Sequence, residues 1–180
     1  MQYDRTMTAT TYLIDRENKR ILLHIHKKTG RLYPLGGHIE PRELPHEAAL
    51  REVFEESGLD VTLAYPRRRE KICSFELPAP LHLLHENVKD PVQNIDFIYA
   101  AFLPAGIKTD EFHPMDGESK QFFLVSKEEL DAGYAKAEDG TEIPIPPHIR
   151  ETAIGIYNEF FGDDTLNDSS NKIQKQIYRR

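Results

Sequence analysis

The stretch from Gly37 to Leu59, GHIEPRELPHEAALREVFEESGL, constrains this chain more than any other part of it. It starts with a glycine turn and a short acidic loop and continues into a predicted helix. Pro45 suits the first helical turn, where its missing N–H costs no hydrogen bond, and Gly58 suits the position just past the last turn. At about 100° per residue, the apolar side chains of this helix fall on one arc, which comprises Ala49, Leu50, Val53 and Phe54. We expect this arc to pack on a sheet.

Three glutamates occupy the adjoining arc of the predicted helix: Glu52, Glu55 and Glu56. Carboxylates three and four residues apart repel each other on an isolated helix. The pattern therefore has two interpretations. The three side chains either form a solvated acidic face or surround a hard cation such as Mg²⁺ or Mn²⁺, which prefers oxygen ligands.

The flanking residues favour the interpretation in which the three glutamates surround a cation. Five residues separate Gly37 from Glu43, and seven more lead to the run REVFEESGL, which starts at Arg51. This arrangement resembles the signature of the Nudix hydrolase family, glycine-x5-Glu-x7-Arg-Glu-apolar-x-Glu-Glu-x-Gly-apolar, at every specified position. The resemblance implies an α/β fold, an α/β/α sandwich around a mixed β-sheet. It also implies hydrolysis of a diphosphate bond in a nucleoside diphosphate linked to another group.

The resemblance also assigns roles to individual residues. Mg²⁺, with Mn²⁺ as a possible substitute, is expected on Gly36, Glu52, Glu55 and Glu56. Glu55 and Glu56 are expected to be the principal metal ligands. Glu52 is expected to orient the reacting groups or to act as the general base, although family members differ in the identity of that base. Glu118, which precedes an aromatic strand, is a further candidate metal ligand and catalytic residue.

Four residues of the signature are expected to be structural: Gly37, Glu43, Arg51 and Gly58. Arg51 is expected to pair with Glu43 and to hold the acidic loop against the helix. The chain departs from the usual family pattern at Leu35, which stands between Pro34 and the glycine pair, and at Arg42, where glycine is frequent. Both departures affect the loop and neither affects the expected ligands.

Residues outside the signature determine which substrate is bound. The chain lacks the arrays typical of relatives that cleave NADH, ADP-ribose or dinucleoside polyphosphates, which leaves (deoxy)nucleoside triphosphates or modified nucleotides as the favoured small-molecule substrates. ADP-ribose or nucleotide sugars are the alternative. A catalytically silent nucleotide-binding sensor is the rival of a different class. A relationship to the isopentenyl diphosphate isomerases is a poorer match, because Cys73 lies in an apolar run. Four aromatic residues are candidates for base stacking or for the core: Tyr12, Tyr33, Phe97 and Tyr99.

Composition limits the remaining possibilities. The chain has 180 residues, one cysteine and a formal net charge of −7. We expect one Nudix domain over residues 5–162 and a polar tail over 163–180. The negative charge argues against a dedicated nucleic-acid binder. No apolar run is long enough to span a membrane, and no secretory signal is evident, so we expect a cytoplasmic monomer or homodimer.

Elsewhere the apolar patterns predict strands at 8–13, 20–26, 60–63, 72–77, 95–103 and 118–125, and helices at 126–130 and 148–161. His24 and His26 share one strand face and are interpreted as polar-face residues, with a metal or phosphate role as the alternative. Residues 65–71 form a basic loop, either a hairpin tip or a phosphate contact. We predict an irregular loop over the active site at 81–94, which carries His82 and His85.

Overall fold

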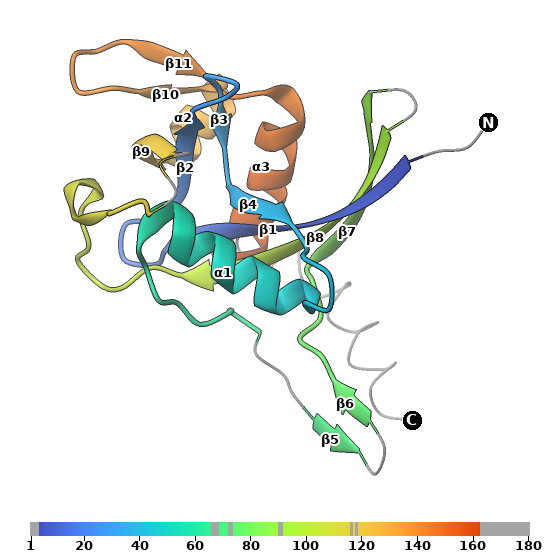
Figure 1. Cartoon of the computed structure of the whole chain (residues 1–180). Coiled ribbons are helices and arrows are strands. Elements are labelled where there is room, and N and C mark those ends of the chain that lie inside the picture. Colours follow the sequence, from blue (N-terminus) through green and yellow to red (C-terminus); the bar gives the residue numbers. More distant parts are fainter. Residues whose placement is uncertain are drawn as a thin grey trace.

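The computed structural model describes residues 4–65, 69–71, 74–89, 92–115, 117 and 119–162. In this part of the chain the strands form one main mixed sheet, with helices on both faces (Figure 1). Its strand order is β3-β2-β1-β8-β7, with β4 paired to β1 and β9 paired to β2. These strands are β1 (Asp4–Asp15), β2 (Arg20–His26), β3 (Leu32–Tyr33), β4 (Leu35–His38), β7 (His82–Lys89), β8 (Val92–Phe102) and β9 (Ser119–Val125).

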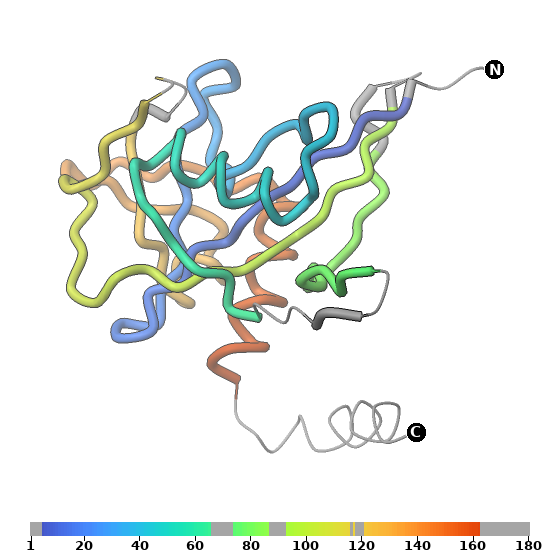
Figure 2. Tube along the Cα trace, turned by 60° about the horizontal axis from the view of Figure 1, so that its bottom comes forward, coloured from blue at the N-terminus to red at the C-terminus, as the bar shows by residue number. Residues whose placement is uncertain are grey.

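Strand β1 is the centre of the sheet. It runs parallel to β8 from the Asp4–Val92 pair to the Ile14–Phe102 pair, and the two strands lie side by side in both views of the chain (Figures 1 and 2). The other pairings are antiparallel, so the sheet is mixed. On its other side, β1 pairs first with β4 and then with β2. The predicted hairpin of residues 8–13 and 20–26 is confirmed.

The two faces of the sheet are covered by different helices. On one face, α1 (Pro45–Ser57) packs Ala48, Ala49 and Val53 onto a cluster that contains Ala9 and Leu13. Side chains alternate between faces along a strand, and the neighbouring β1 residues Tyr12 and Ile14 belong to a second cluster. That cluster contains Ile149, Ala153 and Ile156 of α3 (Pro147–Phe161). The predicted α/β/α sandwich is confirmed.

The ends of α1 follow the sequence signals. Pro45 opens the helix, and the Glu47 carboxylate accepts a hydrogen bond of 3.0 Å from the Leu44 N–H. Gly58 ends it with a left-handed φ of 76°, and its N–H donates to the Phe54 carbonyl at 2.8 Å. The predicted apolar arc is wrong at Phe54, whose side chain is 44% exposed. The buried arc instead continues through Ser57 and Glu56.

Several predictions outside α1 are confirmed. Strand β8 lies between β1 and β7, as expected for the most apolar run. Helix α2 (Lys127–Ala132) starts after Ser126, whose hydroxyl accepts from the Glu129 N–H while the Glu129 carboxylate accepts from the Ser126 N–H. This reciprocal capping satisfies two backbone donors. The last helix was expected at 148–161 and begins one residue earlier.

Other predictions are wrong. Residues 81–94 are not an irregular loop, because β7 occupies most of them and pairs with β8. Residues 60–63 form no strand and contribute only a bridge from Leu63 to Ala101. The hairpin of β10 (Tyr134–Lys136) and β11 (Glu142–Pro144) was not predicted. The remaining elements are β5 (Arg69–Lys71), β6 (Ser74–Glu76) and the short 3-10 helix η1 (Thr109–Glu111).

Some sequence predictions lie wholly or partly outside the described residues, among them the metal role of Glu118, the core position of Cys73, the strand at 72–77, the basic loop around 66–68 and the tail at 163–180. Among the helices of the described part, none combines the length and the apolar composition needed to cross a membrane.

Candidate active site

The glycine pair in β4 meets the last turn of α1. The Gly36 N–H donates a hydrogen bond of 2.8 Å to Glu56 Oε2. The Glu56 side chain is only 2% exposed, although the sequence placed it on the acidic arc. A buried carboxylate is costly unless it is hydrogen-bonded or paired, so this contact fixes the carboxylate beside the Gly36 backbone.

His24 of β2 completes the surroundings of Glu56. Its Nε2 lies 3.8 Å from Glu56 Oε1, and both side chains are buried. The His24 ring stacks on Phe122, with the ring centroids 6.2 Å apart. The interpretation of His24 as a polar-face residue is therefore wrong. Its sequence signal was its place between Leu23 and Ile25 in a strand that is buried on both faces.

Arg51 joins the acidic loop to the helix. Its guanidinium contacts Glu43 through Nε at 2.8 Å and Nη2 at 3.0 Å, which confirms the expected pair. Nη1 also contacts Glu52 Oε1 at 2.8 Å and Glu55 Oε2 at 2.9 Å. The hydrogen bonds from Arg51 hold the pKa of Glu43 below its ordinary value. The positive charge of the Arg51 guanidinium thus reduces the repulsion among these three carboxylates.

The carboxylates of α1 suit a hard cation in their chemistry. Glu52 and Glu56 lie against the Gly36–Gly37 pair of β4, which forms a strand and not the predicted glycine turn, whereas the Glu55 side chain is 41% exposed. In the described part of the chain, no group of three or more His, Cys, Asp or Glu side chains is arranged around a common point. Arg51 contacts one oxygen each of Glu52 and Glu55, and a carboxylate offers about four acceptor positions. The all-oxygen donor set therefore fits Mg²⁺ or Mn²⁺ after a change of side-chain conformation.

The two glycines are required for different reasons. A Cβ at Gly36 would lie 2.5 Å from the Ala9 carbonyl oxygen and 2.8 Å from the Thr10 Cα, both in the backbone of β1. A Cβ at Gly37 would lie 2.4 Å from Glu52 Oε1, at the end of a flexible side chain.

We therefore expect Gly36→Ala and Gly37→Ala to separate stability from activity. Gly36→Ala forces β4 away from β1 and lowers the thermal midpoint. Gly37→Ala displaces the Glu52 carboxylate, keeps the fold and lowers kcat/KM by about 10- to 100-fold, as misplaced site residues do. Thermal unfolding and steady-state kinetics on both variants check this. A fully active Gly37→Ala protein would show that the position of Glu52 does not matter.

A cavity of about 200 Å³ adjoins Gly36 and Gly37 on the face of the sheet that α3 covers. Asp96 of β8 lines it and is 6% exposed. Its carboxylate accepts from the Thr8 hydroxyl at 3.0 Å and from the Thr10 hydroxyl at 2.8 Å. Burial raises the pKa of the Asp96 carboxyl, and the two threonines partly offset this. The sequence analysis missed Asp96, whose signal was a lone carboxylate in the most apolar run.

The chain matches the family model described as NUDIX domain over residues 4–144. The chain belongs to the Nudix family. Among solved structures, a Nudix-family hydrolase from Clostridium perfringens is similar, with 32% identity, a TM-score of 0.66 and coverage of 86% of this chain and 97% of that one. A comparison with curated protein sequences found no match.

Two further solved structures support the fold alone. A MutT protein from Methanosarcina mazei has 16% identity and a TM-score of 0.58, and the match covers 93% of this chain and 99% of that one. The dihydroneopterin triphosphate pyrophosphohydrolase of E. coli has 15% identity and a TM-score of 0.57, with coverage of 89% and 97%.

Membership of the Nudix family establishes the general activity. The protein is a hydrolase that acts on phosphorus-containing anhydrides. Enzymes of this family act on small nucleotide-type substrates and generally use divalent metal cations. The expectations of a Nudix enzyme and of an α/β fold are thus confirmed.

Proposed function

We propose that this Nudix enzyme hydrolyses the diphosphate bond of a nucleoside diphosphate linked to a further group, with Mg²⁺ held by Glu52, Glu55 and Glu56. The observation that carries the proposal is the contact between the buried Glu56 carboxylate and the Gly36 N–H. This contact turns the Gly36 backbone and the acidic side of α1 toward one another, and the Gly36 carbonyl is a further proposed ligand.

The three glutamates have different roles in the proposed reaction. A phosphoanhydride is shielded by its negative oxygens, so attack by water requires charge neutralisation and a positioned nucleophile. When bound, Mg²⁺ neutralises phosphate charge and lowers the pKa of a coordinated water. Glu56 is fixed by the Gly36 N–H. Glu52 and Glu55 are held by Arg51. One of these glutamates accepts the proton of the attacking water, and we assign Glu52 to this or to orientation of the water. Glu118 remains a proposed additional ligand.

We propose (deoxy)nucleoside triphosphates or modified nucleotides as the substrate class. The small cavity beside Gly36 and Gly37 supports this choice, because it offers a place for a base next to the diphosphate site. ADP-ribose and nucleotide sugars are the alternative, and both carry a second sugar that needs room beyond this cavity.

A panel of substrates tests the activity. Nucleoside triphosphates, oxidised nucleotides, ADP-ribose, NADH, nucleotide sugars and dinucleoside polyphosphates are incubated with Mg²⁺. Phosphate release is measured without a helper enzyme, with added pyrophosphatase and with added phosphatase, which locates the bond that is cut. We expect turnover of at least one nucleotide well above that of a Glu56→Gln control. If one compound binds tightly and none is turned over above the control, the protein is a nucleotide sensor.

A further inference from the structure

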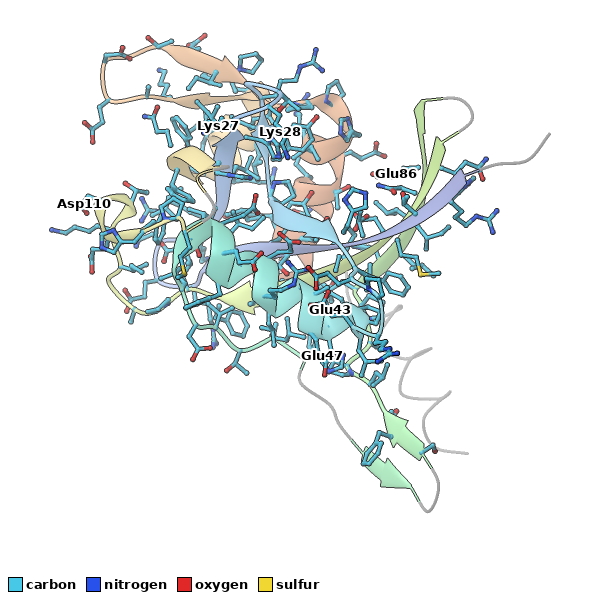
Figure 3. All side chains as sticks on the ribbon, in the orientation of Figure 1. Lys27, Lys28, Glu43, Glu47, Glu86 and Asp110 are labelled. Carbon is cyan, nitrogen blue, oxygen red and sulfur yellow. The ribbon has the colours of Figure 1, made fainter. Side chains whose placement is uncertain are left out.

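His24 is a buried side chain of β2 that lies under the last turn of α1. Side chains two apart on a strand face the same side, and Leu22 belongs to the cluster on which α1 packs. His24 lies two residues further along β2 and is 1% exposed. In Figure 3, Glu47 marks the first turn of α1, whereas Lys27, which follows β2 directly, lies toward the other end of the helix. Strand β2 thus brings the His24 ring to the end of α1 that carries Glu56.

The His24 ring is held in place by aromatic neighbours. Antiparallel pairing sets His24 opposite Phe122 of β9, and the two rings stack with centroids 6.2 Å apart and an interplanar angle of 21°. The His26 ring lies at 65° to the His24 ring, with centroids 5.9 Å apart. Phe112 in turn packs edge-on against Phe122, with centroids 4.7 Å apart. Aromatic pairs at roughly 4.5–7 Å attract one another, so these contacts fix the direction of the imidazole.

The fixed ring presents its Nε2 atom to Glu56. Nε2 lies 3.8 Å from Glu56 Oε1, while the Gly36 N–H donates to Oε2 at 2.8 Å. The last torsion of a glutamate side chain has a broad energy profile, so contacts determine the plane of the carboxylate. A distance of 3.8 Å is too long for a direct hydrogen bond. The imidazole instead limits the rotation of the carboxylate by its bulk and by the polarity of its nitrogen edge.

Glu56 needs such a neighbour because it lies on the buried side of α1. Arg51 contacts the other two proposed ligands, Glu52 at 2.8 Å and Glu55 at 2.9 Å. Glu56 is 2% exposed, and the groups that face its two oxygens come from β4 and β2. Side chains that orient metal ligands change metal affinity or activity by about 10- to 100-fold when they are removed. His24 therefore has the position to do for Glu56 what Arg51 does for Glu52 and Glu55.

We propose that His24 is a positioning residue that holds the Glu56 carboxylate in the orientation needed to bind Mg²⁺. His24 contacts neither the metal nor the substrate in this role, and it acts on the metal affinity through Glu56. The inference rests on the proposed Mg²⁺-dependent hydrolysis and adds a residue that determines how tightly the ion is held. The competing role is purely structural: His24 would fill space between Phe122 and α1, and any ring of similar size would serve.

Binding of Mn²⁺ to the metal-free full-length protein tests the proposal without turnover. Electron paramagnetic resonance measures how much of the added Mn²⁺ remains free. His24→Phe keeps a ring against Phe122 and removes the nitrogen, and we expect it to weaken Mn²⁺ binding by about 10- to 100-fold. His24→Gln places an amide nitrogen at about the reach of Nε2, and its affinity should stay closer to that of the wild type. If His24→Phe does not fold, His24→Asn, whose amide is too short to reach Glu56, takes its place.

Thr11→Val is the matched control. Thr11 of β1 is also buried under α1, and its hydroxyl donates to the Ala49 carbonyl at 3.3 Å, a backbone group of the helix and not a proposed ligand. Its Mn²⁺ affinity should equal that of the wild type even if its thermal midpoint falls. Kinetics give a second comparison. In His24→Phe the Mg²⁺ concentration that gives the half-maximal rate should rise, whereas a mere loss of folded protein would lower kcat and leave this concentration unchanged.

Two results overturn the proposal. One is wild-type Mn²⁺ affinity in a folded His24→Phe or His24→Asn protein, and the other is equal weakening in His24→Phe and His24→Gln, which would assign His24 a packing role. Glu56→Gln separates this inference from the proposed function. If Glu56→Gln loses Mn²⁺ binding and His24→Phe retains it, the metal site stands and the role of His24 fails. If Glu56→Gln binds Mn²⁺ as the wild type does, the proposed metal site fails, and the role of His24 fails with it.

Discussion

Glu56→Gln is expected to lower kcat with the preferred nucleotide by about 100- to 1,000-fold, the loss typical of removing one electrostatic contact to the reacting group. The substitution is nearly isosteric. The glutamine Oε1 can still accept the Gly36 N–H that now contacts Glu56 Oε2. What is lost is the negative charge that is proposed to hold Mg²⁺ next to the diphosphate.

The fold is expected to survive this change, because a buried carboxylate carries a desolvation penalty that an amide does not. Glu56 is 2% exposed, and His24 lies 3.8 Å from it. The thermal midpoint of the metal-free Glu56→Gln protein should therefore equal or exceed that of the wild type. This separates a lost charge from a damaged structure.

Metal binding gives a second measurement that does not depend on turnover. A ligand that binds only the folded state stabilises it by mass action. Added Mg²⁺ or Mn²⁺ should raise the wild-type thermal midpoint and should raise that of Glu56→Gln much less.

Glu47→Gln is the matched control, since Glu47 lies on the same helix and its carboxylate accepts a backbone N–H of Leu44. Its activity and metal response should resemble the wild type. A folded Glu56→Gln protein with wild-type kcat would remove Glu56 from the metal site.

The sequence predicted helix α1 well because its signals are local. Pro45, Gly58 and the Glu43–Arg51 spacing determine where the helix begins, where it ends and which loop it holds. The burial of Glu56 and the exposure of Phe54 were not predicted, and they have a different cause. Periodicity identifies an apolar arc, but the position of β4 decides which side chains are buried, and the Gly36 N–H draws Glu56 inward. The Phe54 side chain is 44% exposed.

The strands show the same division between local signals and tertiary contacts. Residues 95–103 are apolar enough to be assigned without a partner. The segment at 81–94 contains charged and polar residues, and it becomes a strand because it pairs with β8 from His82 to Lys89. Residues 60–63 have strand-like composition and only one bridge, at Leu63. Whether a neighbouring strand is available for pairing therefore overrides strand propensity.

The cavity lined by Asp96 depended on strand register, which composition does not reveal. Asp96 was hidden in an apolar run, and the threonines that contact it belong to β1, nearly ninety positions away in the chain. Only parallel pairing of β1 with β8 sets these residues next to each other. The α1 carboxylates could be identified from one continuous stretch, whereas the cavity required the sheet.

Arg51→Ala is expected to lower both stability and activity. The Arg51 guanidinium contacts Glu43, Glu52 and Glu55, so its removal leaves three carboxylates close together without their common cation. Breaking a fully buried ion pair costs about 3–5 kcal/mol. Arg51 is 25% exposed, and we expect a smaller loss, about 1–3 kcal/mol. Loss of a residue that orients metal ligands lowers activity by about 10- to 100-fold.

Acid should reduce the difference in stability between the wild type and Arg51→Ala. Arg51 lowers the pKa of folded Glu43, so the stabilisation is fully present above the unfolded pKa of about 4.3 and is lost as pH falls through the folded pKa. Urea unfolding at pH 7 and at progressively lower pH measures this convergence. Arg20→Ala is the matched control, because Arg20 forms a 2.7 Å pair with Asp15 at the β1–β2 turn. That variant should lose some stability and keep full activity. If Arg51→Ala also keeps full activity, Arg51 does not position the glutamates of α1, and its role is confined to holding the loop that carries Glu43.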